Sequence, residues 1–266
     1  MITRSIQSAV PVELPPVHQL PPATVFRWLN RGWQDMRRTG SPSLLHGLIV
    51  ALVSIAIVAL TLLRWELVII AASCFLITGP FLATGLYALS RDLEQGGRPT
   101  VAHAVDAWRH ASRCLFRFGL LLVLVCCLWV ALSLALFYLF VNVRIADPAD
   151  FLRYVLTQHD GLFTLWSILG GMVAAVVFGI TVIAMPLMVD RDVDTWFAIR
   201  ASVRAVGENP TTMVLWAMVI LVTTGIACAT LMLGFIVLYP VMGHASWHVY
   251  RDLVDASALP SHTTAE

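Results

Sequence analysis

Long apolar runs, each able to cross a lipid bilayer as a helix, constrain the fold of this chain more than any other feature. A helix needs about 20 apolar residues to cross the roughly 30 Å hydrocarbon core of a bilayer. The chain has 266 residues, of which 59% are hydrophobic and 12% charged, and its mean hydropathy is +0.81. A water-soluble core of this size needs a polar shell, which so few charged residues cannot supply. The composition therefore predicts an all-α integral membrane protein.

The apolar runs predict six membrane spans. The last run, residues 211–250, has about 40 residues without a charge, and one helix of that length would reach roughly 60 Å. It is either one long helix or two helices with a tight turn near residues 229–234, so five spans are the alternative to six. The six predicted spans cover residues 44–63, 67–89, 118–143, 162–189, 211–229 and 233–250.

The arginines flank these spans unevenly. Five precede the first span, five lie between the second and third, three follow the fourth and one follows the sixth, whereas three lie in the opposite loops. Positive residues collect on the cytoplasmic side of a membrane. We therefore expect a multi-pass membrane protein with both termini in the cytoplasm. The opposite loops hold Arg64, Arg144 and Arg153.

Two tails are predicted outside the six-span membrane domain of residues 24–255. Residues 1–23 contain five prolines and lack the apolar core of a signal peptide, which indicates a disordered, extended cytoplasmic tail. Residues 256–266 are predicted as a disordered C-terminal tail.

The second span of each predicted hairpin repeats one pattern. Each contains a proline, Pro80, Pro186 or Pro240, which kinks a helix because it removes a backbone hydrogen bond. Each then ends in an Arg-Asp pair, expected to anchor at the inner membrane surface. The pattern predicts a six-helix bundle of three pseudo-repeated helical hairpins, with chance similarity of apolar helices as the alternative. The pairs are Arg91-Asp92, Arg191-Asp192 and Arg251-Asp252.

Three segments between or before the hairpins, residues 24–39, 100–117 and 195–210, are predicted as amphipathic helices lying in the membrane interface. We expect their arginines to contact anionic lipid headgroups, and a docking platform for a cytoplasmic partner is the alternative. Their predicted apolar stripes are Val25, Trp28, Leu29, Trp33 and Met36; Val101, Ala104, Val105, Trp108, Ser112 and Leu115; and Trp196, Ile199, Val203 and Val206.

Small residues in the fourth span predict close packing against another helix, either within the chain or in a homo-oligomer. They are Gly170, Gly171, Ala174, Ala175 and Gly179.

We expect no metal and no cofactor. His244 and His248, spaced i, i+4, and His46 at the same depth are the candidate ligands if a metal or haem is bound. Histidines in such places more commonly form local hydrogen bonds.

Three stretches resemble a known family. They are Gly32-Trp33-Gln34-Asp35, GPFLATGLYALSRDLEQG at residues 79–96 and GHASWHVYRDLV at residues 243–254. They resemble the bacterial integral membrane family called domain of unknown function 2189, over roughly residues 24–255. The resemblance implies an inner-membrane protein of about six helices and implies no activity.

Catalytic patterns are absent from the sequence. It holds no phosphate-binding, dinucleotide, nucleophile-elbow or zinc-protease motif. The predicted spans have no charged residue in their interiors, which argues against a proton-coupled transporter. We therefore predict a non-catalytic assembly or membrane-organising protein rather than an enzyme. The alternatives are a transporter or channel for an apolar or lipid-like solute and, less favoured, a histidine-ligated metal or haem protein. The expected partners are anionic lipid and either a membrane protein or a second copy, without nucleic acid.

Overall fold

The computed structural model describes residues 13–63, 70, 73, 75, 79–109, 113–141, 150, 153–154, 157 and 161–261, and these are largely helical. The all-α prediction is confirmed: no β-sheet forms within these ranges, and two isolated bridges are the sole strand-like pairings. The helices are α1 (Thr24–Thr39), α2 (Ser41–Leu63), α4 (Thr84–Glu94), α5 (Val101–Arg109), α6 (Arg113–Phe140), α8 (Leu162–Thr181), α9 (Ala184–Asp190), α10 (Thr195–Glu208), α11 (Pro210–Ala229) and α12 (Phe235–Leu253).

Local signals set several helix boundaries. Gly40 separates α1 from α2 with a φ of 64°, a conformation that glycine adopts without strain. Asp194 caps α10, because its side chain accepts a hydrogen bond of 2.9 Å from the backbone N–H of Trp196. Asn209 ends α10, and Pro210 occupies the first turn of α11, where its missing N–H costs nothing.

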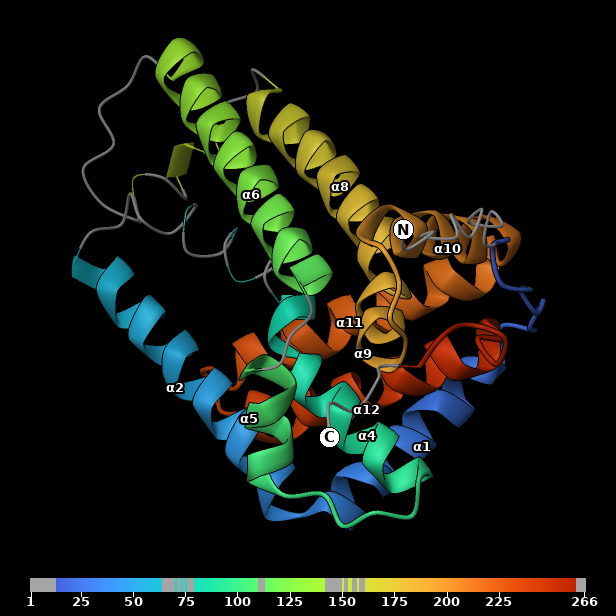
Figure 1. The fold of residues 1–266 in the computed structure, drawn as a ribbon. Helices are drawn as coiled ribbons and strands as arrows, with labels where there is room; N and C mark the ends of the chain where they lie inside the picture. Colours follow the sequence, from blue (N-terminus) through green and yellow to red (C-terminus); the bar gives the residue numbers. More distant parts are fainter. Residues whose placement is uncertain are drawn as a thin grey trace, which may run out of the picture.

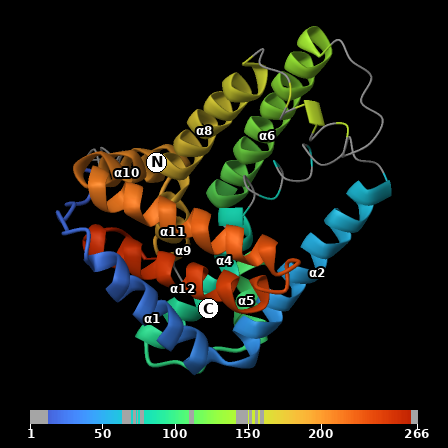
Figure 2. The same cartoon turned by 180° about the vertical axis from the view of Figure 1, so that it is seen from behind.

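Helix α12 lies at the centre of a compact group of helices, which we call the base: α1, α4, α5, α9, α10 and α12 (Figures 1 and 2). Glycines let its neighbours approach closely. A Cβ on Gly32 of α1 would lie 2.6 Å from the backbone oxygen of Val241, and one on Gly47 of α2 would overlap the backbone of Ile236. The position of α12 therefore depends on close backbone contact with both α1 and α2.

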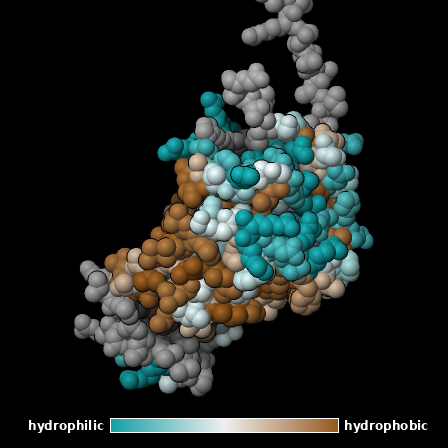
Figure 3. Space-filling view, turned by 90° about the horizontal axis from the view of Figure 1, so that it is seen from below, coloured by the Kyte–Doolittle hydropathy of each residue, from teal (hydrophilic) through white to brown (hydrophobic). Residues whose placement is uncertain are grey.

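Four stretches are long and apolar enough to cross a membrane: Ser41–Leu60, Arg113–Phe140, Leu162–Asp190 and Pro210–Ala229. Figures 1 and 2 show α6 and α8 side by side, extending away from the base, with α2 leaving it elsewhere. Only 22% of the apolar window of α6 is buried, so most of its surface is available to lipid. Figure 3 shows hydrophobic residues gathered on one part of the surface seen from below and hydrophilic residues on another, as expected at a membrane boundary.

These four stretches correspond to four of the six predicted spans. Residues 67–69, 71, 72, 74 and 76–78 of the predicted span 67–89 lie outside the described residues, and its last part belongs to α4, which begins at Thr84. The predicted span 233–250 corresponds to α12, which packs mainly against α1, α2 and α4 and is not among the four. Residues 211–250 do form two helices rather than one, with a turn that includes Leu231 and Met232 at positive φ.

The three prolines differ in their effect. The chain turns at Ala83, shortly after Pro80, and α8 and α9 are separated at residues 182–183, before Pro186. Ser202 stabilises the second break, since its hydroxyl lies 3.2 Å from the backbone nitrogen of Ile183 and donates to the oxygen of Gly179. Helix α12 continues through Pro240.

Parts of both predicted tails belong to the base. The backbone N–H of His18 donates to the oxygen of Leu253 (2.8 Å), and that of Asp255 donates to Pro16 (3.1 Å). Leu259 is buried against the core. Residues 13–22 and 254–261 are therefore held against the helices, in contrast to the expected disorder of residues 1–23 and 256–266 over these parts.

Candidate functional site

Six buried polar side chains meet where α1, α2, α4 and α12 join, and we call them the polar ring. Each is at most 7% exposed. They are Asp35, Thr39, Ser43, Ser90, His244 and His248.

Continuous hydrogen bonds connect these side chains. Asp35 Oδ2 accepts from Ser90 Oγ (2.8 Å) and lies 2.8 Å from His248 Nε2. Ser90 Oγ is 2.7 Å from Nδ1 of His244, and Nε2 of His244 is 2.8 Å from Ser43 Oγ. The hydroxyl of Ser43 also bonds to that of Thr39. The Thr39 hydroxyl reaches back to the backbone oxygen of Asp35 (2.9 Å), which closes the ring.

The carboxylate determines the direction of these hydrogen bonds. An ionised carboxylate can only accept, so the proton of Ser90 points to Asp35, and the oxygen of Ser90 accepts from Nδ1–H of His244. Nε2 of a neutral His244 then accepts from Ser43. The one hydroxyl proton of Thr39 is shared between the oxygen of Ser43 and the backbone oxygen of Asp35. The donors of Ser43, His244 and Ser90 thus form a chain that ends on the Asp35 carboxylate, and the network assigns the Nδ1–H tautomer to His244.

Asp35 is held as a carboxylate. Burial alone would raise its pKa, but the hydrogen bonds from His248 and Ser90 hold the pKa below its ordinary value. The hydrogen bonds return to Asp35, so the network joins four helices to one another and does not form a path across the bilayer. His244 and His248 both belong to the polar ring, but the third candidate ligand, His46, does not join them. His46 bonds separately to the backbone oxygen of Leu82 (2.9 Å).

No group of three or more histidine, cysteine, aspartate or glutamate side chains suited to a metal occurs in the part of the chain that the structure describes.

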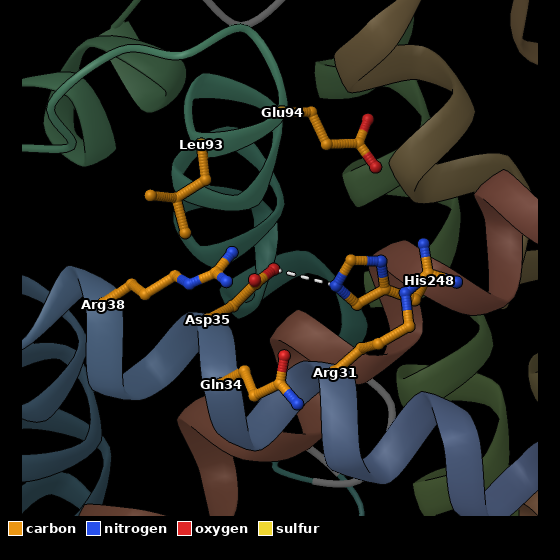
Figure 4. A pocket seen from close by; sticks show the side chains of 7 residues that line it. All are labelled: Arg31, Gln34, Asp35, Arg38, Leu93, Glu94 and His248. Carbon is orange, nitrogen blue, oxygen red and sulfur yellow. Dashed lines mark hydrogen bonds and ion pairs between the residues drawn. The ribbon is translucent and has the colours of Figure 1, made fainter.

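A polar pocket of about 210 Å³ opens beside the ring (Figure 4). Arg31, Gln34, Asp35 and Arg38 line it from α1, Leu93 and Glu94 from α4, and His248 from α12.

Some charges in the pocket are already matched. Arg31 pairs with Asp252 at 2.8 Å, and Glu94 pairs with Arg251 at 3.1 Å. The pairs with Arg31 and Arg27 also hold the pKa of Asp252 below its usual value, against the opposing effect of burial.

The predicted anchors lie against protein rather than free at the surface. Arg91 donates to the backbone oxygen of Val189 (2.5 Å). Arg191 and Arg251 both lie beside Asp190, at 3.1 and 3.7 Å. The three arginines therefore converge on the end of α9.

The aspartates of the first and third Arg-Asp pairs contact the amphipathic helices rather than the end of α9. Asp92 bonds to His103 of α5 (2.8 Å), and Asp252 accepts from Trp28 of α1 (3.0 Å). Asp192 is joined through its backbone N–H to Pro260.

The small residues of α8 divide between two surroundings. A Cβ on Gly170 would lie 3.1 Å from the Trp129 ring of α6, in line with close packing. One on Gly171 would meet nothing within 4 Å in the described structure, and Ala174 and Ala175 are exposed. Gly179 lies beside α10 through its bond to Ser202.

The sequence did not single out Asp35, Ser43 and Ser90 as site residues, yet a signal was present. Each stretch that carries the family resemblance contributes to the ring: residues 32–35 hold Asp35, residues 79–96 hold Ser90, and residues 243–254 hold both ring histidines.

Residues 67–190 match the model of a family described as "Predicted integral membrane protein (DUF2189)". This confirms the resemblance over that part of the chain, which includes the 79–96 stretch; the other two stretches lie outside it. No curated protein and no solved structure matches the chain significantly. The family describes a membrane protein and assigns no activity.

Proposed function

We propose that this chain is a non-catalytic, membrane-organising protein of the bacterial inner membrane, whose base contacts anionic lipid at the cytoplasmic face. The observation that carries the proposal is a set of exposed aromatic residues beside arginines on α1 and α10. Phe26 and Trp196 are each 70% exposed and Trp33 is 44% exposed. Aromatic rings next to basic residues are typical of helices that lie in the headgroup layer.

The surroundings of these aromatics support the proposal. Val25 and Trp28 fill the inner side of α1, and Ala198 and Ala201 fill that of α10, so the outward rings are not needed for the core. Arg37 and Arg200 lie one turn along from Trp33 and Trp196 on the same helices. A protein with apolar spans and exposed aromatic and basic residues of this kind is expected to enrich anionic lipid around itself.

A spin-labelled lipid experiment tests this function. In reconstituted vesicles, we expect the wild-type protein to immobilise several-fold more labelled phosphatidylglycerol than phosphatidylcholine, since each basic residue near the surface contributes about 1 kcal/mol. The Arg37→Ala/Arg200→Ala variant, which removes the charges beside Trp33 and Trp196, should lose most of this preference. Leu120→Ala/Leu124→Ala, which changes exposed residues of α6 and no charge, is the control.

Equal binding of both lipids by the wild type would contradict the proposal. A single protein that copurifies in a fixed ratio, with no lipid preference, would favour the assembly role instead. Transport of an apolar or lipid-like solute would be favoured by uptake into vesicles that is lost with the protein.

We extend the proposal to a six-span topology of three hairpins with both termini in the cytoplasm. The pairing of residues 16–18 with residues 253–255 supports it, because these segments must lie on one side of the bilayer. The convergence of Arg91, Arg191 and Arg251 supports a common level for the three hairpin exits.

Reporter fusions test the topology. Alkaline phosphatase, which is active only outside the cytoplasm, should be inactive at either end of the chain, and a fluorescent protein that folds in the cytoplasm should be bright at both. One active phosphatase fusion would place the two ends on opposite sides and overturn the even number of spans.

A further inference from the structure

The pocket beside the polar ring has hydrogen-bonding groups that the protein itself leaves unused. Nδ1 of His248 is buried and has no partner among the described residues, although Nε2 of the same ring is bonded to Asp35. Gln34 and Arg38 line the same pocket and form no hydrogen bond or ion pair with the described residues. A buried polar atom without a partner is costly in a folded protein. The unused groups of this pocket therefore indicate that it binds a ligand.

The charges that remain unmatched favour an anion. Asp35 already accepts two hydrogen bonds, and Glu94 is paired with Arg251. Arg31 is engaged by Asp252. The groups left over are the guanidinium of Arg38 and the amide of Gln34, which donate, and Nδ1 of His248, which donates in the imidazolium form of the ring.

The geometry of His248 suits a phosphate oxygen. Nε2 of His248 lies 2.8 Å from the Asp35 carboxylate, and in an imidazolium–carboxylate pair of this kind Nδ1–H is the second donor of the ring. The adjacent carboxylate compensates the charge of that imidazolium. Figure 4 shows Arg38, Gln34 and His248 around the same space as Leu93 and Glu94 of α4. A pocket of about 210 Å³ has room for a headgroup phosphate, since a water molecule takes up roughly 30 Å³ in the liquid.

We propose that this pocket binds one phosphate group, held by Arg38, Gln34 and Nδ1 of His248. The phosphate belongs either to an anionic lipid headgroup or to a free phosphate-containing solute. The lipid version rests on the proposed function, because it places the base at the headgroup layer.

Thermal unfolding of the full-length protein in phosphatidylcholine nanodiscs tests the proposal. One arm adds phosphatidylglycerol to the nanodiscs, and a second adds inorganic phosphate to the buffer. A ligand that binds only the folded state raises the unfolding midpoint, and at saturation we expect a rise of roughly 5 °C. Arg38→Ala and Gln34→Ala should abolish the rise. Arg98→Ala is the matched control, because it removes the same charge from an exposed position outside the pocket and outside α1 and α10.

The arms separate the two sources of phosphate. A rise with phosphatidylglycerol alone assigns a lipid headgroup, and an equal rise with inorganic phosphate assigns a soluble ligand. The proposal is overturned if Arg98→Ala and Arg38→Ala lose the rise equally, since the effect would then be diffuse surface charge. It is also overturned if neither probe raises the wild-type midpoint.

Failure here can be told apart from failure of the proposed function. The preference for spin-labelled phosphatidylglycerol depends on Arg37 and Arg200 and should survive Arg38→Ala. A wild type that prefers the labelled lipid but gains no stability from either probe keeps the membrane-organising role and loses the pocket.

Discussion

Replacing Asp35 by alanine is expected to lower the free energy of unfolding by roughly 2–5 kcal/mol, because Ser90 and His248 would each keep a buried donor without an acceptor. Asp35→Asn retains one acceptor, so its free energy of unfolding should lie between those of Asp35→Ala and the wild type. Chemical unfolding in detergent micelles, followed by tryptophan fluorescence, measures the loss. Asn30→Ala, at an exposed position of the same helix, is the control.

The same comparison has a predictable pH dependence. The pKa of Asp35 is lowered in the folded state, so its stabilising effect is present above its unfolded-state pKa of about 3.9. It is lost as the pH falls through the lower, folded-state pKa. The gap in stability between wild type and Asp35→Ala should therefore be constant near neutral pH and should shrink below about pH 4. A loss no larger than that of Asn30→Ala at pH 7 would show that the ring does not stabilise the base.

Gly47→Val is expected to prevent α2 from packing on α12. A Cβ at this position overlaps the backbone of Ile236 and Phe235, which cannot move aside as a flexible side chain could. Overpacking of this kind costs roughly 1–3 kcal/mol and more where backbone is involved. We expect little folded protein in membranes and early elution of aggregate from a sizing column.

Gly171→Val provides the matched comparison for Gly47→Val. It makes the same substitution in another apolar helix, where a Cβ meets nothing within 4 Å in the described structure. It should give folded protein in near wild-type amounts. Equal yields from both variants would mean that α2 and α12 are not in the close contact described above.

Helix boundaries were predictable from local chemistry. The segment 24–39 coincides with α1, and Asn209-Pro210 does separate α10 from α11. The break in residues 211–250 followed from two signals: one helix would overrun the bilayer, and Arg251 after the run belongs on the side of the other arginines only if the run crosses twice. Such signals depend on neighbours in sequence and need no knowledge of the tertiary fold.

The helix faces that pack against protein were harder to predict. In a membrane, the lipid-facing side of a helix is apolar as well, so an apolar stripe does not show which side is buried. Trp196 and Val203, predicted on one apolar stripe of α10, are exposed, whereas Ala198, Ala201 and Ser202 face the protein. Small residues allow α10 to approach α8 and α9, and large apolar ones remain outside. On α1 the stripe was correct for Val25, Trp28 and Met36 but not for Trp33.

The polar ring needed the tertiary fold. Its members come from positions as distant as Ser43 and His244, and serine and threonine near helix ends are too common to indicate a site. His244 and His248 were noticed for their spacing, but as candidate metal ligands rather than as partners of Asp35. Their chemistry became clear only when the fold placed Ser90 between Asp35 and His244, and His248 against Asp35.

The central position of α12 has a consequence for biogenesis. Ribosomes make this helix after every other described helix, yet α1 and the first turns of α2 have their main packing surface on it. During synthesis these early segments must wait, inserted but unpacked, for more than two hundred residues to follow. A chaperone or insertase that shields them during this interval would determine how much of the protein matures.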